Sequence, residues 1–359
     1  MTRDFSQFLP PSLQQSKPRE LSLLEQLGWQ NFFAQQISAE DLDQTPPARV
    51  IEVHRSGLHI RGEGIDTMLP PDAEVTVGDW VLYDADHPAA SRVLERKSLL
   101  KRRAPGHDRA VQLIAANLDT GFIVTSCNQD FNIARLERYV ALCFEAEVDP
   151  VIVLTKPDLC EVDEREAFAT QAATISDRVP VVVVNALEGD VTGALAGWCK
   201  PGRTVGFLGS SGVGKSTLVN ALSGTDAVAT QDIREDDSKG RHTTTRRQLH
   251  LLEGGCVVLD TPGMRELQLT DVQGGVADVF ADLSELAEGC KFRDCQHESE
   301  PGCMVLAAVD RGEVDAARVA RWLKLAREDA FNSATLAQRK AKGRALSKLV
   351  REVKKRKKS

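Results

Sequence analysis

The sequence predicts a multidomain α/β protein with an N-terminal OB-fold β-barrel, a central mostly parallel sheet and a C-terminal α-helical domain. Short alternating apolar runs separated by Gly, Pro and Asp fill residues 48–103, as in small closed barrels. Apolar runs of strand length then alternate with helical segments over residues 104–268, which is typical of a parallel sheet covered on both faces. Helical segments expected at residues 271–288 and 312–327 flank a cysteine-rich stretch within residues 269–334. Residues 1–47 form an N-terminal extension, and residues 335–359 form a basic tail.

The composition is that of an ordinary globular protein, with 42% hydrophobic and 27% charged residues in a chain of 359. No apolar run approaches the ~20 residues of a membrane span, and the first residues lack the apolar segment of a signal peptide. We therefore expect a cytoplasmic protein with no membrane partner. The net charge of −7 is unevenly distributed, because residues 335–359 hold 11 of the 45 Lys and Arg but only one of the 52 acids. A basic tail on an acidic body favours a polyanionic partner at one end.

Residues 48–103 are expected to form a small barrel of the OB kind. Its alternating runs lie at residues 49–53, 57–61, 74–83 and 90–96. OB-folds bind many ligands, so the barrel either presents an oligonucleotide-binding face or only packs on its neighbour. The basic run Lys101–Arg103 at its exit slightly favours RNA. Before the barrel, residues 21–27 predict a short helix that ends at Gly28, and the sequence indicates no role for residues 1–47.

The central domain alternates strands with helices. Strands are predicted at residues 121–125, 150–154, 181–184, 204–208 and 256–259, and helices at residues 133–147 and 161–175 and after residue 214. A hairpin partner at residues 247–252 is expected before the last strand. Each strand leads into a short polar motif, and the carboxyl ends of parallel strands share one edge of a sheet. The loops are therefore expected to converge on one crevice, where such folds bind ligands.

A phosphate-binding loop is predicted at residues 209–216, whose sequence G-S-S-G-V-G-K-S fits the pattern G-x-x-x-x-G-K-[ST] between a strand and a helix. The glycines let backbone amides wrap a phosphate chain, Lys215 adds a positive charge near the outer phosphates, and the Ser216 hydroxyl can ligate Mg²⁺. The residues predicted to hold the phosphates are Gly209, Ser210, Ser211, Gly212, Val213, Gly214, Lys215, Ser216 and Thr217. A nucleoside triphosphate with Mg²⁺ is the implied ligand. The alternative is a Gly-rich turn before a core helix.

A second motif follows the last predicted strand. Asp260–Gly263, with the sequence D-T-P-G, fits the D-x-x-G arrangement. In that arrangement the Asp260 carboxylate reaches Mg²⁺ through water, and the Gly263 amide can meet the γ-phosphate. Alone, these four residues would also make a good turn.

A base-binding motif is expected at Thr155-Lys156-Pro157-Asp158, after the second strand. Asp158 can accept hydrogen bonds from guanine N1–H and the N2 amine, a donor pair that adenine lacks, while the stem of Lys156 covers the base. Asn185 and Ala186, after the third strand, complete the base-reading pair of loops. Alone, T-K-P-D would be a strand-to-helix turn with an Asp cap. Together, these signals at one sheet edge predict a guanine nucleotide.

The motifs resemble those of the translation-factor class of GTPases, but in a circularly permuted order, because the base-reading loops precede the phosphate loop. The permuted order still builds the same crevice if the original termini lay close together, since only the positions of the loops matter. Thr155 stands where the base motif usually begins with Asn, which can cost a supporting hydrogen bond. The chain leaves this domain directly after the D-x-x-G loop, so the nucleotide state is expected to reach the C-terminal domain there.

The sequence leaves the catalytic group open. Met264 follows D-x-x-G, where many GTPases carry the Gln that orients water, and a thioether cannot position a nucleophilic water. Either hydrolysis is slow or another group acts. Our candidate is His242 in the segment G-R-H-T-T-T, although this residue equally well orders the loop or contacts a partner. Thr244 or Thr245 is expected to close on Mg²⁺ and the γ-phosphate, so the predicted catalytic set is Lys215, His242, Thr244 and Thr245.

A metal site is predicted from the pattern C-x4-C-x-H-x5-C, formed by Cys290, Cys295, His297 and Cys303. Three sulfurs and one imidazole nitrogen match closed tetrahedral zinc, one Zn²⁺ per chain, with no open position for chemistry. The role is expected to be structural, because about 60 residues around the site could bury little core without a metal. The other five cysteines are scattered among apolar stretches and are expected to be reduced. The alternative is an accidental cluster of thiols.

The basic tail has helical propensity, with an apolar stripe formed by Leu346, Leu349, Val350 and Val353. Binding to a phosphate backbone is the functional interpretation, and a solvated tail is the alternative.

Together, the OB-like barrel, the permuted GTPase motifs, the G-R-H-T-T-T segment and the C-x4-C-x-H-x5-C cluster resemble the bacterial small-ribosomal-subunit-dependent GTPase family RsgA, also called YjeQ. The resemblance spans Ala48 to Arg327. It implies GTP hydrolysis stimulated by the 30S subunit, a role in late maturation of that subunit, and rRNA contacts through the barrel and the zinc domain. The expected partners are the 30S subunit with its rRNA and GTP or GDP, and we expect a monomer.

Three functional hypotheses follow. The first is a GTP-switched assembly factor that hydrolyses GTP to GDP and phosphate and is thereby released from the 30S subunit. The second, suggested by Met264, is an RNA-binding scaffold that holds guanine nucleotides with little turnover. The third is a P-loop ATPase or kinase, for which ATP would compete with GTP and Asp158→Asn would leave affinity unchanged.

Overall fold

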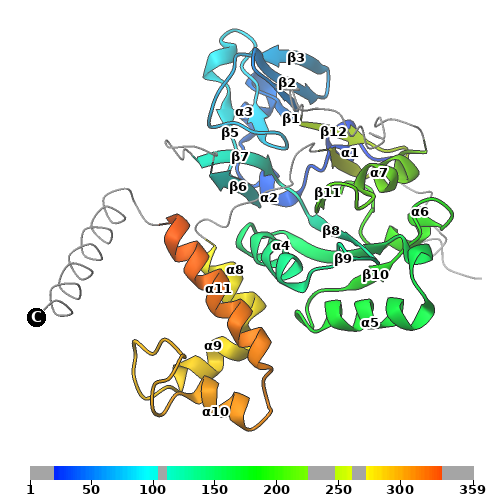
Figure 1. Cartoon of the computed structure of the whole chain (residues 1–359). Coiled ribbons are helices and arrows are strands. Elements are labelled where there is room, and N and C mark those ends of the chain that lie inside the picture. The colour runs from blue at the N-terminus through cyan, green and yellow to red at the C-terminus, as the bar shows by residue number, and fades with distance from the viewer. Residues whose placement is uncertain (1–19, 104–110, 225–246, 261–271, 334–359) are drawn as a thin grey trace, which may run out of the picture.

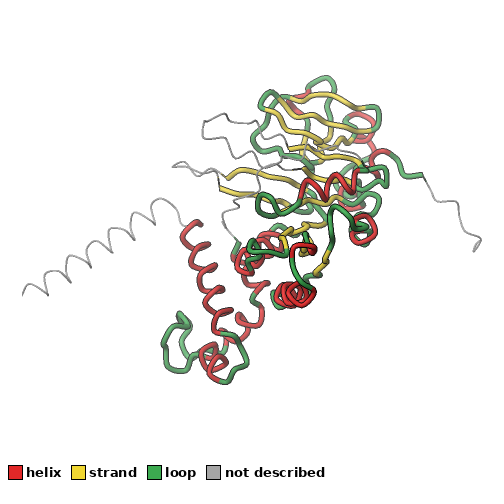
Figure 2. Tube along the Cα trace, turned by 45° about the vertical axis from the view of Figure 1, so that its right-hand side comes forward, coloured by secondary structure: helices red, strands yellow, loops and turns green. Residues whose placement is uncertain are grey.

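The structure, a computed structural model, describes residues 20–103, 111–224, 247–260 and 272–333 (Figure 1). A β domain with N-terminal helices lies at one end, a sheet covered by helices lies in the middle, and a helical domain lies at the other end (Figures 1 and 2). Within the described ranges, no helix combines the length and the apolar character needed to cross a membrane.

The β domain has five antiparallel strands in the order β5-β4-β1-β2-β3. They are β1 (Pro47–His54), β2 (Gly57–Gly62), β3 (Ile65–Leu69), β4 (Trp80–Leu82) and β5 (Arg92–Val93). The strands expected at residues 49–53 and 57–61 are present, whereas β3 is not foreseen by the sequence. Most of the strand expected at residues 74–83 is a turn, because the Asp79 carboxylate accepts a hydrogen bond from the Thr76 amide at 2.8 Å.

From residue 20 onward, where the described structure starts, three short helices precede β1 and pack on the β domain. They are α1 (Leu23–Gln26), α2 (Asn31–Ala34) and α3 (Ala39–Gln44). Trp29 and Phe33 lie against Trp80 of β4, with ring centroids 4.8 and 5.8 Å from that of Trp80. The described part of the N-terminal extension is therefore an apolar cover for this domain.

The central sheet has five parallel strands in the order β10-β9-β8-β11-β13. Their bounds are β8 (Thr120–Ser126), β9 (Asp149–Thr155), β10 (Val181–Val183), β11 (Thr204–Leu208) and β13 (Val257–Asp260). β12 (Arg247–Leu251) pairs antiparallel with β13, as the sequence predicts, and it also pairs with β1 at Gln248 and Glu52. The central sheet therefore continues into the β domain.

Helices cover both faces of the central sheet. The four are α4 (Ile133–Glu145), α5 (Val162–Ala173), α6 (Val191–Leu195) and α7 (Lys215–Ser223). In β8, Ile123 joins the buried cluster that contains residues of α4 and α5, and Phe122 joins the cluster that contains residues of α6 and α7. Because successive side chains of a strand point to opposite faces, the predicted parallel sheet covered on both faces is confirmed.

A separate antiparallel ribbon joins the first two parts of the chain. It consists of β6 (Leu99–Arg103) and β7 (Val111–Ala116). The domain boundary expected at residue 103 falls between these two strands.

Arg49 in β1 lies in a buried polar junction and is only 1% exposed. Its guanidinium donates hydrogen bonds to four acceptors, the carbonyls of Leu27, Gly78 and Asn117 and the hydroxyl of Thr204. Burial lowers the pKa of Arg49 to about 10, and the charge of Asp119 offsets part of this effect, so Arg49 is a cation at neutral pH. One side chain thus ties an N-terminal helix, the β domain and the central sheet together.

Asp119, one residue before β8, is the acidic counterpart in this junction. Its carboxylate accepts hydrogen bonds from the Thr204 amide at 2.8 Å, Lys97 at 2.9 Å, Arg203 at 3.0 Å and Gln30 at 3.3 Å. Burial raises the pKa of Asp119, but these donors outweigh burial and hold the pKa below its usual value.

Replacing Arg49 with Met is expected to lower the free energy of unfolding by about 3 kcal/mol, because buried carbonyls lose their donor and Asp119 loses a nearby cation. Urea unfolding measures the change. Arg55→Met, at an exposed position of the turn after β1, is the matched control and should change stability by less than about 0.5 kcal/mol. Equal effects of the two substitutions would contradict this role for Arg49.

The helical domain consists of α8 (Gln273–Val279), α9 (Ala281–Glu288), α10 (Met304–Asp310) and α11 (Ala316–Ser333). The single helix expected over residues 271–288 divides at Phe280, whose backbone (φ −114°, ψ 41°) is not helical and whose side chain is fully buried. The sequence does not predict α10. α11 begins after Asp315, whose carboxylate accepts a hydrogen bond from the Ala317 amide at 3.0 Å.

The helical domain packs on α4 of the central domain. Val276 of α8 and Leu325 of α11 belong to the same buried cluster as Val140 of α4. Glu137 of α4 is fully buried, and its two carboxylate oxygens lie 3.0 and 2.9 Å from Nε of Arg321 in α11. The two domains therefore share one apolar core and a buried ion pair.

Candidate nucleotide site and metal centre

The carboxyl ends of the five parallel strands lie along one edge of the central sheet. Thr155 ends β9, Asn185 comes two residues after β10, Gly209 directly follows β11, and Asp260 ends β13. Because these strands are neighbours in the sheet, the predicted phosphate and base loops meet at one edge.

The phosphate loop turns sharply between β11 and α7. Gly209 has φ of +142°, and a Cβ atom there would lie 2.3 Å from the carbonyl oxygen of Val124. Gly214 has φ of +95° and caps α7. A side chain is therefore sterically excluded at Gly209, and at Gly214 a side chain would strain the backbone. Lys215 begins the helix, and its ammonium donates hydrogen bonds to the carbonyls of Gly209, at 2.8 Å, and Ser210. The cation therefore lies over the loop, beside the amides of the first helical turn.

Two side chains of the base motif form hydrogen bonds with the backbone of the phosphate loop. The Thr155 hydroxyl is fully buried and donates to the carbonyl of Val213 at 2.6 Å. The Lys156 ammonium donates to the carbonyl of Gly212 at 2.7 Å, and the Lys156 backbone is left-handed with φ of 53°. The supporting hydrogen bond that the Asn-to-Thr departure puts in doubt is therefore made here by the shorter Thr side chain.

Thr155→Val removes this hydroxyl at nearly constant volume. We expect GDP to bind about fivefold more weakly, because the Val213 carbonyl loses its donor and the two loops are no longer held together. Thr155→Ser keeps the hydroxyl and should retain at least half of the wild-type affinity. Titration calorimetry with GDP measures both, and equal losses in the Val and Ser variants would show that the hydroxyl does not matter.

The two remaining base-reading positions differ in their surroundings. Asp158 is exposed in the 3-10 turn Pro157–Leu159, with its carboxylate accessible to a ligand. The side-chain oxygen of Asn185 accepts hydrogen bonds from the amides of Leu187 at 3.0 Å and Glu188 at 3.3 Å. Asn185 therefore shapes its own loop, beside half-buried Ala186.

His242, Thr244, Thr245, Gly263 and Met264 lie outside the described residues. For Asp260, only the backbone at the end of β13 is described.

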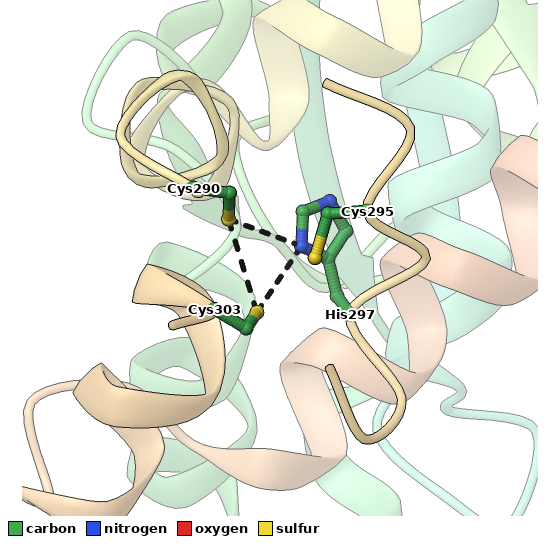
Figure 3. Close-up of side chains that lie close together, drawn as sticks. All are labelled: Cys290, Cys295, His297 and Cys303. Atoms are coloured by element: carbon green, nitrogen blue, oxygen red, sulfur yellow. Dashed lines mark hydrogen bonds between the residues drawn. The ribbon is translucent and has the colours of Figure 1, made fainter. Parts of the chain in front are cut away.

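The four predicted metal ligands come together in the helical domain (Figure 3). Cys290 Sγ lies 3.8 Å from Cys303 Sγ, and His297 Nδ1 lies 3.6 Å from the first sulfur and 3.4 Å from the second. The ligand atoms of all four residues, including Cys295, lie within 4.8 Å of one another. Two sulfurs bound to tetrahedral zinc at about 2.3 Å would be about 3.8 Å apart. The donor set and its spacing therefore fit zinc.

Side chains and amides that the sequence does not single out support this cluster. The amides of Met304 and Leu306 lie 3.4 and 3.5 Å from the sulfurs of Cys290 and Cys303. Glu300 organises the intervening loop, because its carboxylate accepts hydrogen bonds from the amides of Ser299, Gln296 and Glu298. These amide donors lower the pKa of Glu300 to about 2. Its exposed acidic side chain gives no sequence signal for this role.

His297 is also oriented from outside the loop. Its ring lies against that of Trp322 in α11, with centroids 5.2 Å apart. The metal cluster is thereby connected to the long helix that packs on the central domain.

Comparison with known proteins gives a consistent result. The family model described as RsgA GTPase matches residues 93–270. The small ribosomal subunit biogenesis GTPase RsgA 2 of Vibrio parahaemolyticus is 50% identical over 336 residues, which are 92% of this chain and 92% of that protein. The chain belongs to the RsgA family. A second RsgA, from Mesorhizobium japonicum, is 50% identical over 86% of this chain and 91% of its own length.

Solved RsgA-like structures share the fold. YjeQ from Thermotoga maritima aligns with a TM-score of 0.56 at 25% identity, over 78% of this chain and 96% of its own. YloQ, described as a circularly permuted GTPase, aligns with a TM-score of 0.55 at 24% identity, over 81% of this chain and 97% of its own. A second family model, described as ABC transporter, matches residues 194–347, a range that includes the phosphate loop. That loop is common to P-loop proteins, and the relatives matched over nearly their full length decide for RsgA.

Proposed function

We propose that this RsgA family member is a GTPase that acts in maturation of the small ribosomal subunit. It hydrolyses GTP to GDP and phosphate, and the 30S subunit stimulates that hydrolysis. The names of the two relatives that are each 50% identical support the biological role. The observation that carries the chemistry is the pair of hydrogen bonds from Thr155 and Lys156 to the phosphate loop. They hold the base-reading loop and the phosphate-binding loop as one unit.

The site residues divide into three roles. Residues Gly209–Thr217 cradle the phosphates, and the Lys215 ammonium neutralises charge on the outer ones. Asp158 accepts hydrogen bonds from guanine, and the side chain of Lys156 covers the base. The Ser216 hydroxyl and the Asp260 carboxylate are hard oxygen donors of the kind that Mg²⁺ prefers. When bound, Mg²⁺ neutralises charge that develops on the phosphates. His242, Thr244 and Thr245 remain our candidates for orienting water and closing on the γ-phosphate.

The outer domains are proposed to bind the subunit. The antiparallel β domain is an OB-fold that contacts rRNA, the zinc centre at Cys290, Cys295, His297 and Cys303 is structural, and the basic tail binds phosphate backbone. The protein acts as a monomer in the cytoplasm. GTP orders the segments at residues 240–245 and 260–265, and hydrolysis releases the protein from the subunit.

A route for that signal follows from the helical domain. α8 begins at Gln273, ten positions after Gly263 of the D-x-x-G motif, and the Val272 amide donates to the buried Asp329 carboxylate of α11 at 3.0 Å. A change at the γ-phosphate can therefore be transmitted to the zinc domain through residue 272. The apolar core shared with α4 makes a large free rotation of that domain costly.

The proposal is tested by measuring GTP hydrolysis by the zinc-loaded chain with and without purified 30S subunits. We expect the subunits to raise the rate at least tenfold and Lys215→Ala to abolish the increase. If wild-type hydrolysis stays slow with saturating subunits, the proposed GTPase role is wrong. Nucleotide-dependent subunit binding without turnover would instead favour the scaffold suggested by Met264.

A further inference from the structure

Three exposed apolar residues lie in or next to the base-reading loops. Leu187 is 82% exposed, Leu159 is 59% exposed and Val162 is 53% exposed. They follow the neighbouring strands β9 and β10, which end at the same edge of the sheet. β10 is the outermost strand of the central sheet, with α5 packed alongside (Figure 1). Exposed apolar side chains that share one edge of the sheet with the base-reading loops indicate a contact surface.

The same edge is strongly acidic. The segments that follow the carboxyl ends of β9 and β10, residues 158–166 and 185–190, contain seven Asp and Glu but only one Arg. Asp163 and Glu166 of α5 lie three residues apart, on the same exposed side as Val162. Glu188 is exposed next to Leu187. Among the described residues none of these three carboxylates forms an ion pair. We call these six residues, Leu159, Val162, Asp163, Glu166, Leu187 and Glu188, the α5 edge face.

We propose that the α5 edge face binds a basic protein segment on the small ribosomal subunit, one that carries apolar side chains among its Lys and Arg. This inference rests on the proposed function. Unpaired carboxylates repel a phosphate backbone, so this face does not fit RNA. They attract cationic side chains, while the exposed leucines and valine bury apolar ones. Because the face is continuous with the loops after β9 and β10, its partner contacts segments that hold the base.

The test reverses charge on the face in the full zinc-loaded chain. Asp163→Lys/Glu166→Lys is compared with Glu40→Lys/Asp43→Lys, which makes the same charge change at exposed acids of α3. We expect the α5 variant to bind 30S subunits at least tenfold more weakly at about 0.1 M salt, with unchanged subunit-free GTP hydrolysis. The α3 variant should bind as tightly as wild type or more tightly, because it only adds positive charge. Equal binding by all three proteins would overturn the proposal.

A second measurement identifies the partner's chemistry. RNA-free protein extracted from 30S subunits should bind wild type and the α3 variant, but bind the α5 variant at least tenfold more weakly. Tighter subunit binding by the α5 variant would mean that the face meets RNA, and the proposal would be wrong. It would also be wrong if deleting residues 334–359 removed the difference, because the occupant would then be the chain's own tail. If wild type binds the protein fraction in this way but shows no stimulated hydrolysis, only the proposed function fails.

Discussion

Cys303→Ser is expected to abolish stoichiometric zinc binding and to unfold the helical domain, while the nucleotide domain stays folded. Cys303 is the N-cap of α10 as well as a member of the metal cluster. Serine is also a good N-cap, so the substitution removes the thiolate ligand and leaves a capping oxygen. Binding of structural zinc contributes on the order of 10 kcal/mol to folding in small domains, and the loop at residues 291–302 has little other core. The loss should therefore exceed that of any single apolar truncation.

Metal content by atomic emission and hydrogen exchange of residues 273–333 measure this outcome. Wild type should hold one zinc per chain, and the variant should hold less than about one tenth of that. Cys199→Ser, at a half-buried thiol of the central domain, is the control and should keep full zinc content. Full protection of residues 273–333 in metal-free Cys303→Ser would show that the metal does not stabilise this domain.

Arg321→Met is expected to lower the free energy of unfolding by about 3 kcal/mol at pH 7, because it leaves the buried Glu137 carboxylate without its main partner. Burial already raises the pKa of Glu137, and the hydrogen bonds and charge of Arg321 oppose that rise. Without Arg321, the pKa of Glu137 in the folded state rises further. When the pKa of a carboxyl is higher in the folded state than in the unfolded state, that carboxyl contributes most to folding stability at pH values below its unfolded-state pKa. That contribution is lost as pH rises through the folded pKa.

The Arg321→Met defect should therefore shrink between pH 7 and about pH 4, where Glu137 takes up a proton. Urea unfolding across this range measures it. Adding Glu137→Leu to the variant removes the unpaired charge, so it should restore part of the stability at pH 7 and abolish the pH dependence that Arg321→Met introduces. A pH-independent defect that the second substitution does not relieve would contradict the ion-pair explanation.

The parallel sheet and its motifs can be predicted from sequence because each rests on a local signal. β8, β9 and β11 contain continuous apolar runs, and such runs predict buried strands. The phosphate loop is identified by its own glycines. The cysteine spacing likewise encodes the metal cluster, since its ligands lie close along the chain.

Other features depend on contacts that sequence patterns do not encode. From the sequence, Arg49 is expected to be a solvent-exposed strand residue, yet it is buried among carbonyls from three distant segments. The docking of α11 on α4 depends on Glu137 and Arg321, which are 184 positions apart. That Thr155 keeps the supporting hydrogen bond of the base motif could not be foreseen, because this bond joins a loop 58 residues away.

The central claim is that Asp158 makes this phosphate-binding site specific for guanine, and nucleotide titration of wild type and Asp158→Asn tests it most directly. Wild type should bind GDP and GTP, with no competition from ATP. The variant should bind GDP at least a hundredfold more weakly, because guanine N1–H and its amine lose a charged acceptor. The variant should gain affinity for xanthosine diphosphate, because the C2 carbonyl of xanthine accepts a hydrogen bond from the Asn amide. Asp177→Asn, at an exposed position of the same domain, should bind like wild type. Competition by ATP, or unchanged GDP affinity in Asp158→Asn, would contradict the claim.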